Sequence, residues 1–229
     1  MYHHVAGPPP GSDGATYISP RRFEAQCAWL RRRGYESVSL SALAAALRGE
    51  AAPPRRPVVF TFDDAWRDVG ETAWPILRAA GFRATVFVVG EGIGERAVAH
   101  RESREQAPSA VLEAAQLREL AGDGWEIGSH TLTHRHLTRL TREQARREIA
   151  AGHEAVERAL GGRGAAKVFA YPYGDFHGGA ARLAKELGFE AAVVTLGGRL
   201  HMPEGRWTLL RLPIARNLPL WRFVYFLTL

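Results

Sequence analysis

Adjacent carboxylates at the end of an apolar run are the first feature of this sequence that could do chemistry. Asp63 and Asp64 directly follow the run Val58 to Phe62. Two such side chains are costly to bury unless a positive group compensates them, and a bound metal ion is one such group. Taken alone, the pair is better explained by a turn that caps the next helix. The metal hypothesis therefore needs further ligands.

A pair of histidines four residues apart supplies them. His130 and His134 directly follow another strand-like run, and at this spacing two imidazoles reach one ion from a helical face or across a tight turn. No Glu follows His130, which separates the pair from the HExxH motif of metalloproteases. With Asp64 the histidines predict a site of two imidazoles and one carboxylate with open coordination positions, as in catalytic zinc, iron or cobalt sites. His136 is offset by two residues, so we predict that its side chain lies on the surface.

A third strand-like run ends in the sequence Ala170-Tyr171-Pro172-Tyr173-Gly174. Proline and glycine shape a rigid loop here, which could aim a backbone N–H at a reacting carbonyl and so stabilise an oxyanion. A plain turn with a core tyrosine is the alternative, and the other two motifs favour the first interpretation.

Helical stretches alternate with strand-like runs along the chain, and these elements must position the three motifs. Four helical stretches end at a glycine followed by an aromatic residue, where glycine takes the left-handed turn at little cost and the aromatic packs back on the helix. This alternation predicts an α/β protein with a parallel sheet, either open or closed into a barrel. The glycine–aromatic pairs are Gly34-Tyr35, Gly81-Phe82, Gly124-Trp125 and Gly188-Phe189. The predicted strands are residues 36–40, 58–62, 84–89, 126–129, 168–171 and 191–195, and residues 91–108 are predicted to form a long loop or an insertion.

Composition narrows the class of protein. At 229 residues, with 46% hydrophobic and 24% charged residues, the chain fits one globular domain. The net charge of +6 comes almost entirely from arginines at helical spacing, without the compact basic stripe that would indicate nucleic-acid binding. The single Cys27 excludes an intramolecular disulfide and is predicted to be a small core residue. We see no charged leader followed by an apolar run, and the apolar tail 218–229 is too short for a membrane span.

In their order along the chain, the three motifs resemble the signatures TFDDG, H-[ST]-x-x-H and R-x-P-Y of the polysaccharide deacetylase (NodB-homology) family of carbohydrate esterases. The resemblance extends from the opening Met1-Tyr2-His3-His4-Val5 to Arg211-Leu212-Pro213. It implies a distorted parallel (β/α) barrel, with residues 1–229 as a single catalytic domain of this type.

The resemblance also implies roles for individual residues. The first Asp of the family's TFDD pair is the general base, which is Asp63 in this sequence. The second, Asp64, holds one divalent metal ion together with His130 and His134. Zinc is the first expectation for the ion, with cobalt, nickel, iron or manganese as alternatives. The backbone N–H of Tyr173 donates to the oxyanion.

Two positions depart from the family pattern. Ala65 replaces the Gly of TFDDG, which is a mild change if the backbone there keeps a negative φ. Ala170 stands where the third motif has Arg, so we expect the salt bridge that orients the base to be missing.

The family's late Leu-x-His motif, which delivers the general acid, has no match near the end of the chain. The opening Tyr2-His3 is similar to that of a circularly permuted subgroup, which includes the exopolysaccharide poly-N-acetylglucosamine deacetylases and takes its acid from an early Tyr-His. His3 is therefore the candidate acid. A frayed terminus is the alternative, and the acid would then come from His177, His201 or solvent.

The resulting expectation is hydrolysis of N-acetyl groups from a glycan, on residues of the N-acetylglucosamine type. A hydrolase of a small amide or cyclic imide, and a decayed glycan-binding module, are the alternatives. The expected partner is the glycan, without nucleic acid or a membrane span, and the oligomeric state is open. By resemblance the protein would act outside the cytoplasm or at the cell envelope.

Overall fold

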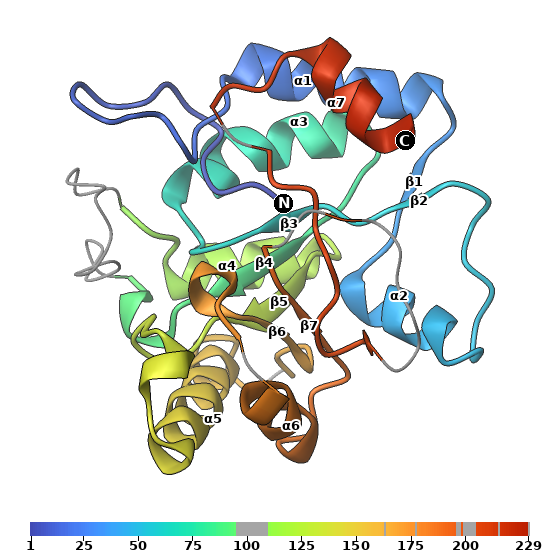
Figure 1. Ribbon diagram of the computed structural model, residues 1–229. Coiled ribbons are helices and arrows are strands. Elements are labelled where there is room, and N and C mark those ends of the chain that lie inside the picture. The colour runs from blue at the N-terminus through green and yellow to red at the C-terminus, as the bar shows by residue number, and fades with distance from the viewer. Residues whose placement is uncertain are drawn as a thin grey trace.

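The computed structural model describes residues 1–94, 110–162, 164–176, 178–195, 198, 205–214 and 216–228. His177, His201 and most of the predicted loop 91–108 lie outside these residues. Within them, five parallel strands form one curved sheet at the centre of the molecule (Figure 1). The strands follow each other in chain order: β3 (Thr61–Phe62), β4 (Thr85–Val88), β5 (Glu126–Ser129), β6 (Val168–Ala170) and β7 (Ala191–Val193). The predicted parallel sheet is confirmed.

Two extended segments close this sheet into an irregular barrel. Residues 209–214 lie along β7 at one edge, and residues 1–3 lie along β3 at the other. Two hydrogen bonds join the segments to each other. The Met1 amine donates to the Leu212 carbonyl, and the Ile214 N–H donates to the Met1 carbonyl, both at 2.9 Å. The fold is therefore a distorted (β/α) barrel whose seam is made of irregular chain.

Helices cover the barrel on two sides (Figure 1). One group lies beside the seam: α1 (Pro20–Arg32), α3 (Trp74–Ala79) and α7 (Leu220–Thr228). The opposite side carries α5 (Arg142–Ala159) and α6 (Gly178–Glu186), with α4 (Ala114–Gly122) behind the sheet and α2 (Leu40–Leu47) next to the small parallel pair β1 (Glu36–Ser37) and β2 (Pro57–Val58). Short helical turns are η1 (Val69–Ala73), η2 (Gly90–Gly92), η3 (Leu137–Arg139) and η4 (Pro172–Gly174). No helix among the described residues is both long and apolar enough to span a bilayer.

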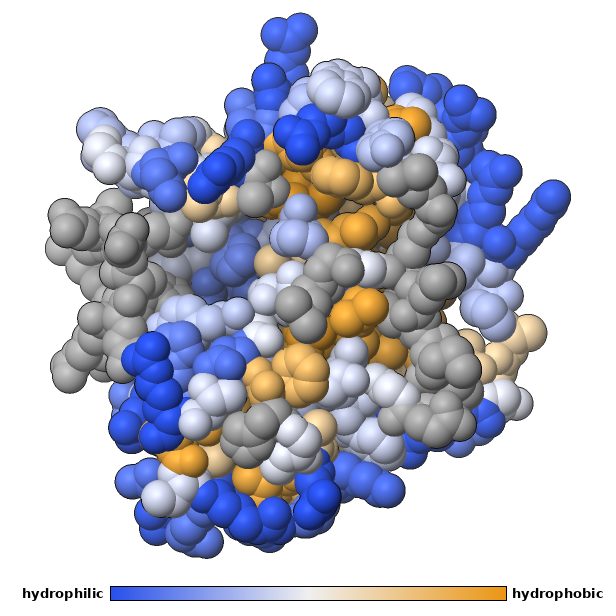
Figure 2. Space-filling view, viewed as in Figure 1, coloured by the Kyte–Doolittle hydropathy of each residue, from blue (hydrophilic) through white to orange (hydrophobic). Residues whose placement is uncertain are grey.

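The core is apolar on both sides of the sheet, and Cys27 is buried in it as predicted. An apolar cavity of about 330 Å³ lies under α7, where Figure 2 shows hydrophobic residues between the helix and the barrel. Phe60 and Phe223 line it together with the seam residues. This cavity is distinct from the polar cluster described below.

The glycine–aromatic pairs end helices as the sequence predicts. The four glycines have φ values of 72°, 75°, 84° and 80°, which residues with a β-carbon rarely adopt. After each glycine, the N–H of the aromatic residue donates to a carbonyl five positions back, which satisfies an orphan carbonyl at the helix end. These bonds are Tyr35 to Leu30, Phe82 to Leu77, Trp125 to Leu120 and Phe189 to Ala184.

Two predicted strands are wrong in extent. The strand predicted at residues 36–40 covers only residues 36–37, because Ser39 caps α2, which begins at Leu40. Residues 58–62 form two strands, because β2 ends at Val58 and pairs with β1, whereas β3 begins at Thr61 and pairs with β4. The chain changes sheets at residues 59–60. With Thr61 as its one polar residue, this run shows no hydrophobic period that would mark such a change.

Helix α5 presses directly on the loop that follows β5. A Cβ added at Gly152 would lie 2.3 Å from the carbonyl carbon of Thr131, so only glycine fits this contact. One turn earlier, the Glu148 carboxylate accepts hydrogen bonds from the N–H of Thr133 at 3.0 Å and from its hydroxyl at 2.7 Å. The helix thereby fixes the loop after β5 that carries the candidate ligands His130 and His134.

Replacing Gly152 by Ala is expected to destabilise the protein, although alanine normally favours a helix. The added Cβ would overlap the Thr131 backbone, and overpacking of this kind typically costs about 1–3 kcal/mol. In the matched control Gly122→Ala, at the end of α4, the added Cβ meets no atom within 4 Å, and the free energy of unfolding should rise by about 0.5–1 kcal/mol. Urea unfolding followed by circular dichroism measures both. Equal effects of the two substitutions would show that α5 does not press on the loop.

Candidate active site

The polar side chains singled out in the sequence converge at one end of the barrel. Asp63 and Asp64 follow β3, His130 follows β5 and Tyr173 follows β6. Parallel strands end at the same edge of a sheet, so segments far apart in sequence meet there. The seam adds His3, which directly follows the residues that pair with β3.

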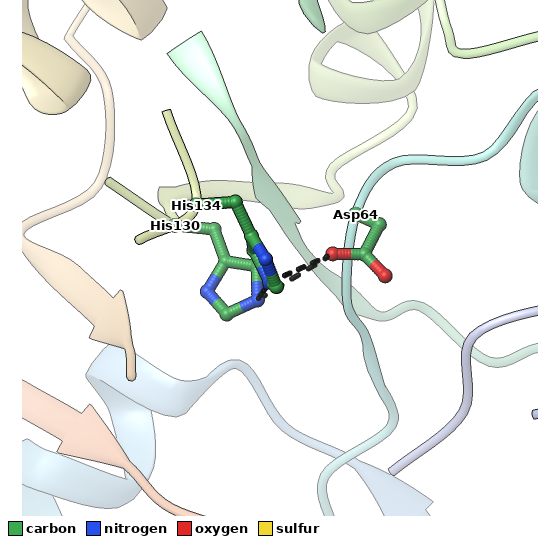
Figure 3. A group of neighbouring side chains, drawn as sticks. All are labelled: Asp64, His130 and His134. Atoms are coloured by element: carbon green, nitrogen blue, oxygen red, sulfur yellow. Dashed lines mark hydrogen bonds and ion pairs between the residues drawn. The ribbon is translucent and has the colours of Figure 1, made fainter. Parts of the chain in front are cut away.

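Asp64, His130 and His134 form a buried triad (Figure 3). The Nε2 atoms of the two histidines are 3.2 Å apart, and Asp64 Oδ1 lies 3.5 Å from each of them. Donor atoms bound at about 2.0–2.2 Å to one tetrahedral ion lie roughly 3.3–3.6 Å apart. The triangle of donor atoms therefore has the size and the chemistry to hold one divalent ion.

The backbone of β6 orients the first histidine. His130 Nδ1 lies 2.7 Å from the Ala170 carbonyl oxygen, which can only accept, so this nitrogen carries the proton. The lone pair of Nε2 is then directed at Asp64 and His134. Metal-binding histidines are commonly fixed in this way by a carbonyl behind the ring.

Several site residues have a left-handed backbone, which is disfavoured for residues with a β-carbon by roughly 1–2 kcal/mol each. Ala65 has a φ of 54°, so the condition under which its replacement of Gly would be mild is not met. The Ala65 carbonyl accepts the Leu112 N–H at 2.8 Å, which helps to hold this conformation. Asp64, Thr131, His134 and Tyr173 share the left-handed region, with φ between 57° and 71°.

A buried ion pair holds Asp63. The two Arg211 terminal nitrogens contact the two carboxylate oxygens at 2.6 and 2.7 Å, and Nε donates to the Val194 carbonyl at 3.0 Å. Asp63 is 1% exposed and Arg211 7%. Burial alone would raise the pKa of Asp63, but the guanidinium facing both oxygens lowers it below its usual value. Asp63 is therefore an ionised carboxylate in a fixed orientation.

The expectation that this salt bridge is missing is wrong. Ala170 cannot supply a guanidinium, but Arg211 on the seam reaches Asp63 from another segment of the barrel. The third motif is where the family pattern places the arginine, and Arg211 lies 41 positions after Ala170. The signal that could have found it is an arginine within the apolar run Leu209 to Ile214, where an unpaired charge would be costly to bury.

The N-terminal residues are well anchored. The Tyr2 N–H donates to the Thr61 carbonyl at 2.8 Å, and the Asp63 N–H donates to the Tyr2 carbonyl at 3.0 Å. This pairing places His3 Nε2 3.9 Å from Asp64 Oδ2, with a fifth of the side chain exposed. The candidate acid therefore lies at the rim of the triad.

The next residue, His4, is a buried anchor that the sequence did not reveal. Its ring lies against those of Tyr17 and Trp66, with centroids 4.1 and 4.6 Å away. Asp68 lies 2.7 Å from His4 Nδ1 and also accepts the Val5 N–H at 2.9 Å. These contacts fix the chain immediately after His3.

The prediction that the His136 side chain lies on the surface is wrong. Its ring stacks on that of Tyr173, with centroids 3.9 Å apart and planes at 15°, and only 20% of its side chain is exposed. A spacing of two residues turns a side chain away from its neighbours only in regular structure, and this loop is irregular.

Comparisons with known proteins agree with this geometry. The sequence profile of the family described as "Polysaccharide deacetylase" matches residues 50–192. YxkH of Bacillus subtilis (strain 168), which carries the same family description, is 26% identical over 215 residues, or 94% of this chain and 70% of that protein.

Two further proteins extend the comparison. The poly-beta-1,6-N-acetyl-D-glucosamine N-deacetylase of Escherichia coli (strain K12) is 33% identical over 109 residues, which are 46% of this chain and 16% of that protein. The structure of Streptococcus pyogenes deacetylase PplD, in complex with acetate, superposes with a TM-score of 0.84 at 24% identity and covers 98% of this chain and 95% of that one.

Replacing Arg211 by Met is expected to lower the free energy of unfolding by about 3–5 kcal/mol at neutral pH. The substitution leaves the buried Asp63 carboxylate without a compensating cation. The loss should shrink as the pH falls towards about 4, since protonated Asp63 needs no cation. In the wild type the lowered pKa of Asp63 contributes stability above the unfolded pKa, and this contribution is lost only as the pH falls through the folded value.

Urea unfolding at several pH values, with a chelator present to remove any bound ion, measures this effect. The matched control is Arg142→Met, which removes an exposed ion pair with Glu186 and should change stability by less than about 1 kcal/mol. A loss for Arg211→Met that is independent of pH would mean that Asp63 is not the group involved.

Proposed function

Because the chain belongs to the polysaccharide deacetylase family, we propose that it hydrolyses N-acetyl groups on a glycan of the N-acetylglucosamine type, with one divalent metal ion. The observation that carries this proposal is the triad of Asp64, His130 and His134, whose donor atoms converge beside the buried carboxylate of Asp63. The name of the Escherichia coli relative supports the choice of sugar.

Asp64, His130 and His134 would hold the ion, for which zinc suits one carboxylate and two imidazoles best. When bound, such an ion polarises an acyl carbonyl and lowers the pKa of water. The ligands come from two loops that the barrel fixes in place, so their positions do not depend on the substrate.

Asp63 would act as the general base. Its carboxylate is ionised and held at both oxygens by Arg211, next in sequence to the ligand Asp64. It accepts a proton from the water whose oxygen attacks the acetyl carbon. A fixed acceptor of this kind contributes roughly 10²–10⁴-fold to the rate.

The other two roles fall to His3 and Tyr173. The Tyr173 N–H donates to the oxygen that gains charge as water adds. As the C–N bond breaks, His3 donates a proton to the leaving nitrogen, and the products are acetate and a free amine. The position of His3 near Asp64 brings it to the rim of the site, where a polymer can reach it.

The alternatives make different predictions for substrates. A hydrolase of small amides or cyclic imides would turn these over faster than N-acetylated oligosaccharides, and a decayed glycan-binding module would bind oligosaccharides without releasing acetate. The pair between Asp63 and Arg211 removes one reason to consider decay. Acetate release from a panel of both substrate classes, with metal content measured in parallel, tests the proposal, and activity confined to small amides would overturn the choice of glycan.

Asp63 and Asp64 are expected to have separate roles, the first as the base and the second as a metal ligand. Asp63→Asn should keep the metal and lose roughly 10²–10⁴-fold in kcat, because proton transfer is lost and the ligands remain. Asp64→Asn should lose both metal and activity. Metal content by elemental analysis and acetate release measure the two effects. Equal loss of metal in the two variants would contradict this division of roles.

Substrates with different leaving groups test the role of His3 as the general acid. His3→Ala should lower kcat on N-acetyl amides by about 10²-fold or more, because the amine must be protonated as it leaves. Activated acetyl esters need little protonation and should lose far less. Kinetics on both substrates measure the ratio. Similar losses on the two substrates would return the role to another histidine or to solvent.

A further inference from the structure

The loop after β6 holds Tyr173 in a conformation that its surroundings must maintain. Tyr173 has φ 60° and ψ 4°, in the left-handed region that residues with a β-carbon avoid. The Thr195 hydroxyl donates to its carbonyl at 3.1 Å. The next residue, Gly174, is so close to the segment after β7 that an added Cβ would lie 1.7 Å from Thr195 Oγ1. A strained residue of this kind persists only where neighbours over-determine it.

Two histidines of the loop after β5 pack against the Tyr173 ring. His136 stacks on it face to face, with a centroid distance of 3.9 Å and an angle of 15°. His134, a candidate metal ligand, meets the same ring at 4.6 Å and 68°. The ring therefore links the conformation of Tyr173 to a loop that carries a candidate ligand.

A carboxylate joins the same two loops a second time. Asp175 Oδ2 lies 3.1 Å from His136 Nδ1 and accepts a hydrogen bond from the Thr138 hydroxyl. The Asp175 N–H donates to the Pro172 carbonyl at 3.0 Å, so this residue also closes the turn around Tyr173. Contacts from His136 thus reach the turn both through the ring of Tyr173 and through Asp175.

We propose that His136 and Asp175 are positioning residues that hold the Tyr173 peptide so that its N–H faces the reacting carbonyl. This inference rests on the proposed function, since it assigns the N–H of Tyr173 to the oxyanion. Both side chains are partly exposed, His136 at 20% and Asp175 at 34%, so they contribute little to the core. Their contacts converge on Tyr173 instead.

The test compares three variants at this cluster. His136→Ala removes the stack and the contact with Asp175, His136→Phe keeps a ring without Nδ1, and Asp175→Asn removes the charge. Removal of a whole oxyanion donor costs about 10²–10³-fold in kcat, so His136→Ala should lose roughly tenfold or more with KM nearly unchanged. His136→Phe should recover most of this loss, and Asp175→Asn should lie between.

Controls separate positioning from other effects. Arg135→Ala, at an exposed position in the same loop, should keep the wild-type kcat. Metal content and the thermal unfolding midpoint of His136→Ala should match the wild type. A loss of metal would mean that His136 acts through His134, a change in KM alone would make it a substrate contact, and an unchanged kcat would remove it from the reaction. Each of these results overturns the proposal.

A structural readout keeps the inference separate from the proposed function. If the wild type releases no acetate from any substrate, the proposed function fails. Crystal structures of the wild type and His136→Ala then decide the inference: Tyr173 should leave the left-handed region in the variant alone. An unmoved Tyr173 would overturn it.

Discussion

The ion pair between Asp63 and Arg211 is the interaction on which the rest of the site depends. A carboxylate that is 1% exposed requires a compensating charge, and the guanidinium that provides it lies on the segment 209–214. That segment must run beside β7 and against Met1 for the arginine to reach its partner. Charge compensation and closure of the barrel are therefore one structural event. An open sheet of the same strands would leave the Asp63 carboxylate unpaired.

Around this pair, the candidate ligands are held by backbone rather than by further charged side chains. The Ala170 carbonyl sets the ring of His130, and Gly152 lets α5 touch the loop that carries the next ligand. The Glu148 carboxylate on α5 holds the same loop by accepting two hydrogen bonds from Thr133. A set of donors arranged in advance avoids the entropy cost of ordering them when an ion arrives. The left-handed residues of the site are the cost of this arrangement.

The sequence predicted what depends on local chemistry. Helix ends at the glycine–aromatic pairs, the parallel sheet and the triad of Asp64, His130 and His134 follow from spacing and residue type, whereas His3 was predicted from the family resemblance alone. What it missed depends on closure. Arg211 meets Asp63 across 148 positions, and no local pattern indicates that residues 209–214 will lie beside β7. The stack of His136 on Tyr173 was missed because the loop is irregular and its left-handed residues follow no period. The division of residues 58–62 between two sheets likewise depends on partners that come later in the chain.

The seam also sets the order in which the molecule can mature during translation. Asp63 leaves the ribosome 148 residues before Arg211, an interval of roughly 7–30 s at the usual elongation rates. The closing bond from Met1 to Leu212 spans 211 positions, so it too must wait until Leu212 has been synthesised. Until then the edge of β7 is unpaired, and the Asp63 carboxylate has to stay hydrated. Contacts of such long range slow folding, because the entropy cost of closing the long loop comes before the contacts form. Chaperones that bind exposed strand edges would therefore matter more to the yield of this protein than to that of a barrel closed by neighbouring strands.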